Sequence, residues 1–182
     1  MELQGKHTVY TIGHSTHSIE EFLLMLRSFS IGILADIRRF PGSAKYPQFN
    51  KEPLQMALQE AGIEYVHLEG LGGRRKTQKN SMNDRWRNDS FRGYADYMET
   101  ADFKRAVENL ENIARTQRTA YMCSEAVWWR CHRSLVSDYL KAQGWTVLHI
   151  RAREKAEEHT YTSPARIVGN RVLYSDENLF NP

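Results

Sequence analysis

Both cysteines of the 182-residue chain lie within eleven residues, together with an acid, a histidine and two arginines. The segment begins with Cys123 and Glu125 and ends with the run Cys131-His132-Arg133. It follows an apolar run at 119–122 and precedes a helical pattern at 134–143, so a strand passes into a helix here. The start of a helix favours anions and lowers the pKa of a thiol, and guanidinium groups add to both effects. The segment therefore predicts a reactive cysteine or an anion-binding site.

Each residue type in this segment suggests a role. Cys131 is the candidate nucleophile or acid, and His132 and Glu125 are candidates for proton transfer. Arg133 is the candidate ligand for an anionic group of the substrate. Cys123 is a further catalytic candidate, although a thiol at the end of a buried strand often serves only in packing. The other residues also have structural interpretations, as caps, packing residues or ion-pair partners.

Strand and helix patterns alternate along the chain. This alternation is typical of βαβ units, so the predicted fold class is α/β: a mainly parallel central sheet of about five strands flanked by helices. The turn Gly169-Asn170 predicts a C-terminal β-hairpin. Residues 1–182 are predicted to form a single α/β domain. Strands are predicted at 7–12, 33–37, 64–68, 119–123 and 146–150, and helices at about 18–29, 50–61, 94–115 with a break near Thr100, and 134–143.

Other polar residues follow the predicted strands. The first strand ends in Gly13-His14-Ser15, where the glycine lets a ligand approach the backbone and the histidine can carry a proton. The second is followed by Arg38, which Asp36 can hold rigid while the guanidinium binds a phosphate or carboxylate. Because the carboxyl ends of parallel strands meet at one edge of a sheet, we expect these residues to share a site with Cys131.

Positive charge is concentrated after the third predicted strand. Residues 70–93 contain seven Lys or Arg and two acids, whereas the whole chain has a formal net charge of only +3. Such a segment indicates either a phosphate or nucleic-acid contact or a solvated loop. Trp128 and Trp129 can stack on a base or exclude water, although packing of their loop is the favoured interpretation.

Composition and cysteine content bear on the class of protein. No apolar run approaches the roughly 20 residues that cross a bilayer, so no membrane association is expected. The two cysteines favour a reducing compartment over a disulfide framework, and the N-terminus lacks a signal-peptide pattern, so a cytoplasmic location is expected. Their spacing matches neither a redox Cys-x-x-Cys nor a standard zinc pattern, which leaves a Cys/His metal site as a minor alternative. No cofactor or oligomeric state is indicated.

Four motifs occur in order: Thr11-Ile-Gly13-His14-Ser15, then Asp36-Ile-Arg38 with Pro41 and Ser43, then Leu71-Gly72-Gly73, then Cys123-x-Glu125 with Cys131-His132-Arg133. Together they resemble the domain-of-unknown-function family 488 over nearly the whole chain. The resemblance implies an α/β domain with the motif residues around one site, and it implies no established reaction. Where many relatives have Asp-Pro before the second cysteine, this chain has Val127-Trp-Trp-Arg130.

Three functions are compatible with these features. The first is an enzyme acting on a phosphate-bearing substrate, a nucleotide or nucleic acid, with the basic segment as a lid or clamp. The second is a non-catalytic nucleic-acid-binding module that uses residues 70–93. The third is a Cys/His metal-binding protein. For the first, the catalytic candidates are Cys131, His132, Glu125, His14 and Cys123, and the substrate-binding candidates are Gly13, Ser15, Asp36, Arg38, Ser43, Gly72, Gly73 and Arg133.

Overall fold

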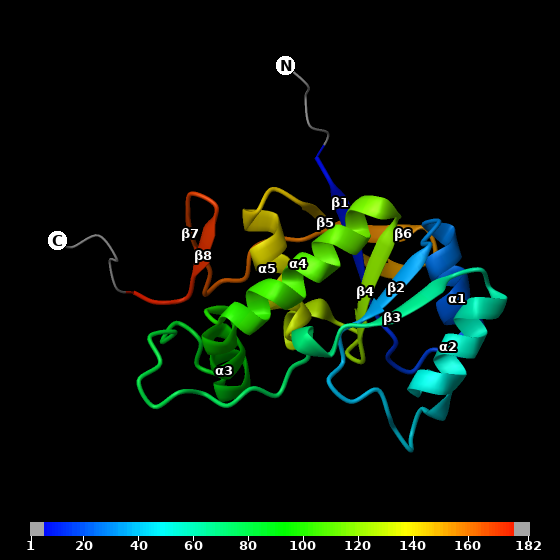
Figure 1. The fold of residues 1–182 in the computed structure, drawn as a ribbon, viewed down its shortest axis with the longest axis horizontal. Helices are drawn as coiled ribbons and strands as arrows, with labels where there is room; N and C mark the ends of the chain where they lie inside the picture. Colours follow the sequence, from blue (N-terminus) through cyan, green and yellow to red (C-terminus); the bar gives the residue numbers. More distant parts are fainter. Residues whose placement is uncertain (1–5, 177–182) are drawn as a thin grey trace.

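A computed structural model describes residues 6–176, which form a six-stranded sheet of order β3-β2-β4-β1-β5-β6 (Figure 1). Each neighbouring pair from β3 to β5 is parallel, whereas β6 pairs with β5 in the antiparallel sense. The α/β class and the parallel sheet are thus confirmed. The strands are β1 Thr8–Gly13, β2 Ile33–Asp36, β3 Glu64–His67, β4 Thr119–Cys123, β5 Thr146–Ala152 and β6 Lys155–Glu158.

The predicted count of about five strands omits β6. This strand has the sequence Lys-Ala-Glu-Glu and is exposed at all four positions, so it lacks the apolar alternation that marks a half-buried strand. It forms because the chain reverses directly after β5, through Arg153 and Glu154, with Glu154 in the left-handed region at φ 54°. Charged side chains along this outer strand also disfavour pairing with another sheet.

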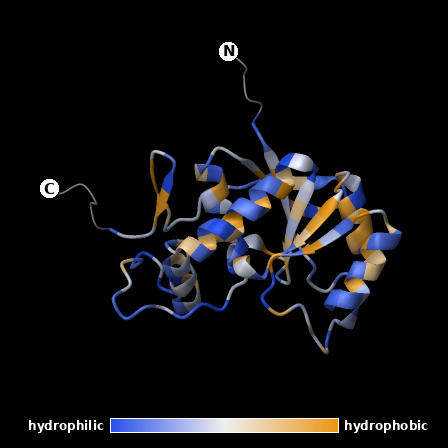
Figure 2. Cartoon of the chain, viewed as in Figure 1, coloured by the Kyte–Doolittle hydropathy of each residue, from blue (hydrophilic) through white to orange (hydrophobic). Residues whose placement is uncertain are grey.

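Helices cover both faces of the sheet (Figure 1). One face packs against α1 and α2, and the other packs against α3, α4 and α5. The strands supply each core by alternation: Tyr121 points to one face, and its neighbours Ala120 and Met122 point to the other. Figure 2 shows this as hydrophobic central strands beneath helices with one hydrophilic side. The helices are α1 Ile19–Ser28, α2 Lys51–Glu60, α3 Asp89–Met98, α4 Ala101–Thr116 and α5 Arg133–Ala142.

Side-chain caps set the boundaries of α3 and α4. The predicted break near Thr100 is confirmed, because the Thr100 hydroxyl accepts a hydrogen bond from the amide of Phe103 at 3.2 Å and starts α4. The helix before it begins at Asp89, five residues earlier than Tyr94, the predicted start. There, Asn88 caps the amides of Ser90 and Phe91, at 2.9 and 3.2 Å.

The basic segment packs against α3 and is not a free loop. The buried Asp96 carboxylate accepts hydrogen bonds from the Gln78 amide at 2.8 Å, the Ser81 hydroxyl at 2.5 Å and the Asn83 side chain at 2.8 Å. Gly93 allows close packing, because a Cβ atom there would lie 2.2 Å from the carbonyl oxygen of Arg75. The segment therefore has a defined path from the sheet to α3.

Two strands beyond the main sheet, β7 Arg166–Val168 and β8 Arg171–Leu173, form the expected C-terminal hairpin. Gly169 in its turn has a φ of 61°, a conformation that glycine adopts without a steric penalty. The hairpin lies beside α5, away from the edge of the sheet that carries the predicted site (Figure 1). Between residues 6 and 176, no helix has the length and apolar character needed to cross a membrane.

Asp96→Ala should release the basic segment from α3. The substitution leaves three donors without their acceptor, so we expect the free energy of unfolding to fall by about 2 kcal/mol. Trypsin should then cleave after Lys79 faster than in the wild type, measured by mass spectrometry of timed digests. Asp102→Ala removes an exposed helical carboxylate that pairs with Arg105, and it should leave cleavage unchanged. Equal cleavage in all three proteins would contradict this role of Asp96.

Candidate active site at the carboxyl edge of the sheet

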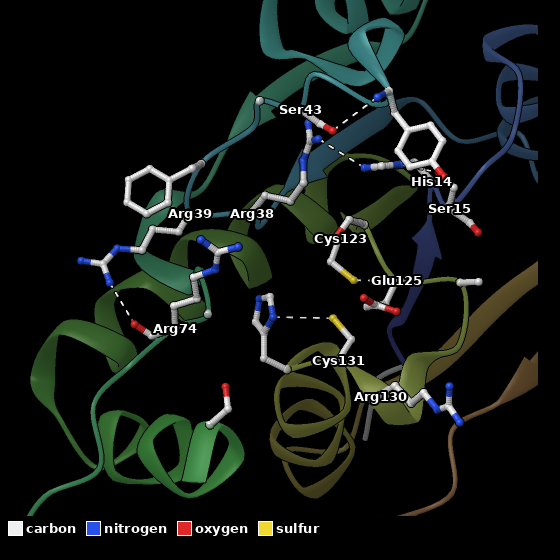
Figure 3. A pocket seen from close by; sticks show the side chains of 18 of the residues that line it. His14, Ser15, Arg38, Arg39, Ser43, Arg74, Cys123, Glu125, Arg130 and Cys131 are labelled. Carbon is white, nitrogen blue, oxygen red and sulfur yellow. Dashed lines mark hydrogen bonds between the residues drawn. The ribbon is translucent and has the colours of Figure 1, made fainter. Parts of the chain in front are cut away.

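A cavity of about 640 Å³ opens at the carboxyl ends of β1, β2 and β4 (Figure 3). This is the position at which parallel α/β sheets bind ligands. Nine sequence candidates line it: His14, Ser15, Arg38, Ser43, Gly73, Cys123, Glu125, Cys131 and His132.

Cys131 and His132 form a thiol–imidazole pair in this cavity. The Nε2 atom of His132 donates to the carbonyl oxygen of Ile37 at 3.3 Å, so Nδ1 is the unprotonated nitrogen. This Nδ1 lies 3.6 Å from the Sγ atom of Cys131. Gly73 makes room for the ring, because a Cβ atom there would lie 3.0 Å from Nδ1. The imidazole is therefore oriented to accept the thiol proton of Cys131.

The two cysteines, which lie together at the centre of the cavity, differ in acidity (Figure 3). Burial alone would raise the pKa of Cys131, but a hydrogen bond from Cys123 and the charge of Arg133 bring it below its ordinary value. The amide of Arg133 also donates to the sulfur of Cys131 at 3.4 Å. Burial raises the pKa of Cys123 well above its ordinary value, and its hydrogen bond to Cys131 raises it further. Cys131 is thus the more acidic of the two thiols.

Arg133 is a buried cation, only 1% exposed. Its Nη2 donates to the carbonyl oxygen of Glu125 at 2.7 Å, its Nη1 donates to the hydroxyl of Thr11 at 3.3 Å, and its Nε has no partner. Within residues 6–176, no carboxylate forms an ion pair with it. Although burial alone would lower it, the neighbouring cysteines hold the pKa of Arg133 above its ordinary value. Since a buried charge needs an opposite charge nearby, Arg133 favours the Cys131 thiolate.

A chain of buried hydrogen bonds leads from Arg133 through the core to Asp138. The Thr11 hydroxyl accepts from Arg133 and donates to Nδ1 of His149 at 2.6 Å. Nε2 of His149 donates to Nδ1 of His159 at 2.9 Å, and Nε2 of His159 donates to Asp138 at 2.8 Å. Burial lowers the pKa of His149 to about 2, so its imidazole is neutral at pH 7. The chain holds the guanidinium of Arg133 in place.

His14 and Arg38 form the opposite wall of the cavity. Two nitrogens of Arg38 donate to the carboxylate of Asp36, at 2.9 and 2.7 Å, and one of them also donates to the carbonyl oxygen of Phe49 at 2.8 Å. The third nitrogen, Nη1, donates only to Nε2 of His14, at 3.4 Å, and has a second N–H for a ligand. Burial, including a ring stacked on Phe49 at 4.3 Å, lowers the pKa of His14 to about 4, so His14 is neutral at pH 7.

Four sequence candidates do not line the cavity. Asp36 is fully buried and orients Arg38, and Arg133 is buried behind Cys131. A Cβ atom on Gly13 would lie 1.7 Å from the carbonyl oxygen of Glu125, and one on Gly72 would lie 2.8 Å from the Cα atom of Arg39. These residues support the lining rather than form it, so substrate contact from Gly13, Asp36, Gly72 and Arg133 stays a prediction.

Several lining residues were not among the sequence candidates. Three are exposed or half-exposed arginines, of which Arg39 and Arg130 adjoin candidates in the chain and Arg74 follows Gly73. Their position next to candidate residues in the sequence is the signal that could have identified these arginines. The aromatic residues had none, because they come from a loop and a helix whose positions depend on the tertiary fold. They are Phe40, Tyr46, Phe91 and Tyr94.

Two lining residues have left-handed backbone conformations without being glycine. Ser15 has a φ of 47° and Arg74 a φ of 58°. This conformation costs roughly 1–2 kcal/mol for a residue with a Cβ atom. Strained backbone of this kind tends to occur at functional sites.

Comparison with known families places the chain in one of them. The model of the family described as "Domain of unknown function DUF488" matches residues 18–140, more than half of the chain. The protein therefore belongs to this family, as its motifs predicted. The matched range contains Arg38 and the whole cysteine segment, and it begins after the His14 motif. No curated protein and no solved structure matches the chain.

Among the residues that the structure describes, no group of three His, Cys, Asp or Glu side chains is placed to share a metal ion.

Iodoacetamide should alkylate Cys131 in preference to Cys123. At a given pH, the thiol with the lower pKa has more reactive thiolate, so we expect at least a tenfold difference in rate at pH 7. Trypsin cleavage after Arg130 separates the two cysteines, and peptide mass spectrometry then follows each one. A rate at Cys123 equal to or above that at Cys131 would contradict the assignment.

Stability should fall as the pH drops below about 6.5. Burial lowers the pKa of His14, His132 and His149 in the folded protein, whereas each titrates near 6.5 in the unfolded chain. Below that pH the unfolded state binds more protons, so the free energy of unfolding decreases. We expect a slope of about 1.4 kcal/mol per pH unit from His149 alone. Urea unfolding at pH 7, 6 and 5 measures this, and a constant free energy would refute it.

Proposed function

We propose that the protein is an enzyme that cleaves a phosphate ester, with Cys131 as the nucleophile. The observation that carries this proposal is the Cys131 sulfur, which faces a cavity with His132 at 3.6 Å on one side and the buried Arg133 amide at 3.4 Å on the other. A thiol with a positioned base and a lowered pKa is an activated nucleophile.

The charge of the cavity favours a phosphate group. Four arginines line it, and among the lining residues within 6–176 Glu125 is the only acid. The charge of Arg38 is balanced by Asp36, which leaves its Nη1 as a fixed hydrogen-bond donor. Arg39, Arg74 and Arg130 have no carboxylate partner within residues 6–176. Guanidinium groups bind phosphate oxygens through charge-assisted and often bidentate hydrogen bonds.

The reaction has two steps. In the first, His132 takes the proton of the Cys131 thiol, the sulfur attacks phosphorus, and the ester P–O bond breaks. The proton passes to the leaving oxygen, which departs as an alcohol, and an S–P bond remains. In the second, His132 takes a proton from water, the hydroxide displaces the sulfur, and the thiol is restored with release of phosphate. Glu125 and His14 remain candidates for proton transfer at the other end of the cavity.

The alternative of a non-catalytic module that binds nucleic acid through residues 70–93 has less support. Arg75 stacks on Tyr97 at 3.8 Å, Arg85 pairs with Asp176, and Arg92 donates to Ser81. Of the basic residues in this segment, only Arg74 lines the cavity. Much of the positive charge is therefore used within the fold. For the metal-binding alternative, no group of three His, Cys, Asp or Glu side chains within residues 6–176 is placed to share a metal ion.

Cys131→Ser should abolish turnover, and it should also lower stability because it removes the sulfur that helps to balance the buried charge of Arg133, so far-UV circular dichroism checks that the variant is folded. A serine hydroxyl has no comparable thiolate, so we expect hydrolysis of p-nitrophenyl phosphate or bis(p-nitrophenyl) phosphate to fall on the order of 100-fold or more. Release of nitrophenolate measures the rate, and intact mass spectrometry of quenched wild-type enzyme should show one added phosphoryl group on Cys131. Met56→Ala, at an exposed position on α2, is the control variant and should hydrolyse both esters at the wild-type rate. Undiminished hydrolysis by Cys131→Ser would refute the nucleophile.

A further inference from the structure

Two exposed aromatic rings are each next to an arginine: Phe40 lines the cavity, and Trp129 directly precedes the lining residue Arg130. Phe40 is 64% exposed and has the guanidinium of Arg39 at 5.5 Å from its ring centre. Trp129 is 48% exposed and has the guanidinium of Arg151 at 5.1 Å. These are the two aromatic residues among the large hydrophobic side chains exposed within residues 6–176. An exposed ring beside a cation is a surface on which a planar, electron-rich group can stack.

The two rings mark the ends of one line along the sheet. Arg39 and Phe40 follow β2, whereas Arg151 lies near the carboxyl end of β5. The sheet order places β4 and β1 between these two strands, so the ends are three strand spacings apart, about 14 Å. Cys131 lies between them, because it lines the cavity at the ends of β4 and β1.

Positive charge extends along the same line. Arg39 and Arg74 lie on one side of the two cysteines, and Arg130 lies on the other (Figure 3). At the far end, Glu157 accepts hydrogen bonds from Arg151 at 2.7 Å and from the indole of Trp128, the sequence neighbour of Trp129, at 2.8 Å. Cations therefore occur on both sides of the nucleophile, which is more than a single phosphate group requires.

We infer that this edge binds single-stranded nucleic acid. A base stacks on Phe40, another stacks on Trp129, and the backbone between them contacts Arg39, Arg74 and Arg130. We call these five residues the edge track. A single strand exposes its bases to such rings, whereas a duplex keeps them stacked inside. The inference rests on the proposed function in one respect: it makes the phosphodiester beside Cys131 the bond that is cleaved.

Fluorescence anisotropy with labelled oligothymidylate, oligouridylate and a DNA duplex tests the edge track. We expect both single strands to bind more tightly than the duplex, with affinity that falls as salt increases. Phe40→Ala and Trp129→Ala should each weaken single-strand binding about tenfold. Met56→Ala and Ile167→Ala remove exposed hydrophobic side chains elsewhere and should leave binding unchanged. Arg39→Gln and Arg130→Gln should each reduce the dependence of binding on salt.

The edge track would be overturned by duplex binding equal to single-strand binding, or by full affinity in both Phe40→Ala and Trp129→Ala. Cys131→Ser should bind the oligonucleotides normally, which separates binding from catalysis. Hydrolysis of the nitrophenyl esters without oligonucleotide binding would overturn the edge track and keep the nucleophile. Oligonucleotide binding that depends on both rings, without any ester hydrolysis, would support the edge track and overturn the proposed catalysis.

Discussion

A positive charge buried at Arg133 is the constraint on which the rest of the site depends. The guanidinium lies at the first turn of α5, where the helix dipole disfavours a cation, and it has no carboxylate partner within residues 6–176. Two features compensate for it. On the cavity side, Arg133 lowers the pKa of the neighbouring Cys131 thiol and so favours its negatively charged form, and on the core side the hydrogen bonds through Thr11 lead to Asp138. The lowered pKa of the Cys131 thiol is thus a consequence of the positive charge that the core buries at Arg133.

Close packing of the backbone keeps this arrangement rigid. Gly13 at the end of β1 lies against the carbonyl group of Glu125, which in turn accepts a hydrogen bond from Arg133. The absence of a side chain at Gly73 gives the imidazole of His132 its space. Gly13 therefore fixes the carbonyl group that binds Arg133, and Gly73 leaves the space that His132 occupies. Their contribution is to geometry, and the polar side chains supply the chemistry.

Sequence reasoning succeeded where the pattern is local. The strand patterns and the helix break near Thr100 were readable, and parallel strands bring His14, Arg38 and Cys131 to one cavity, as expected. It failed for β6, whose charged residues form a strand only because β5 lies beside them. The sequence also could not distinguish residues that line the cavity from residues that hold the lining in place. Asp36 and Arg38 are two residues apart, yet Asp36 is fully buried and Arg38 reaches the cavity. The aromatic wall depends on tertiary packing and has no signature in the chain.

The left-handed backbone at Ser15 and Arg74 has a consequence for engineering. Glycine adopts this conformation without the steric penalty of a Cβ atom, so Arg74→Gly relieves strain in the folded state. Glycine also gives the unfolded chain more freedom, which offsets part of that gain. The same change deletes a cation from the cavity wall. Selection for thermostability alone would therefore tend to erode the charge of this site, a trade-off seen when strained positions also carry function.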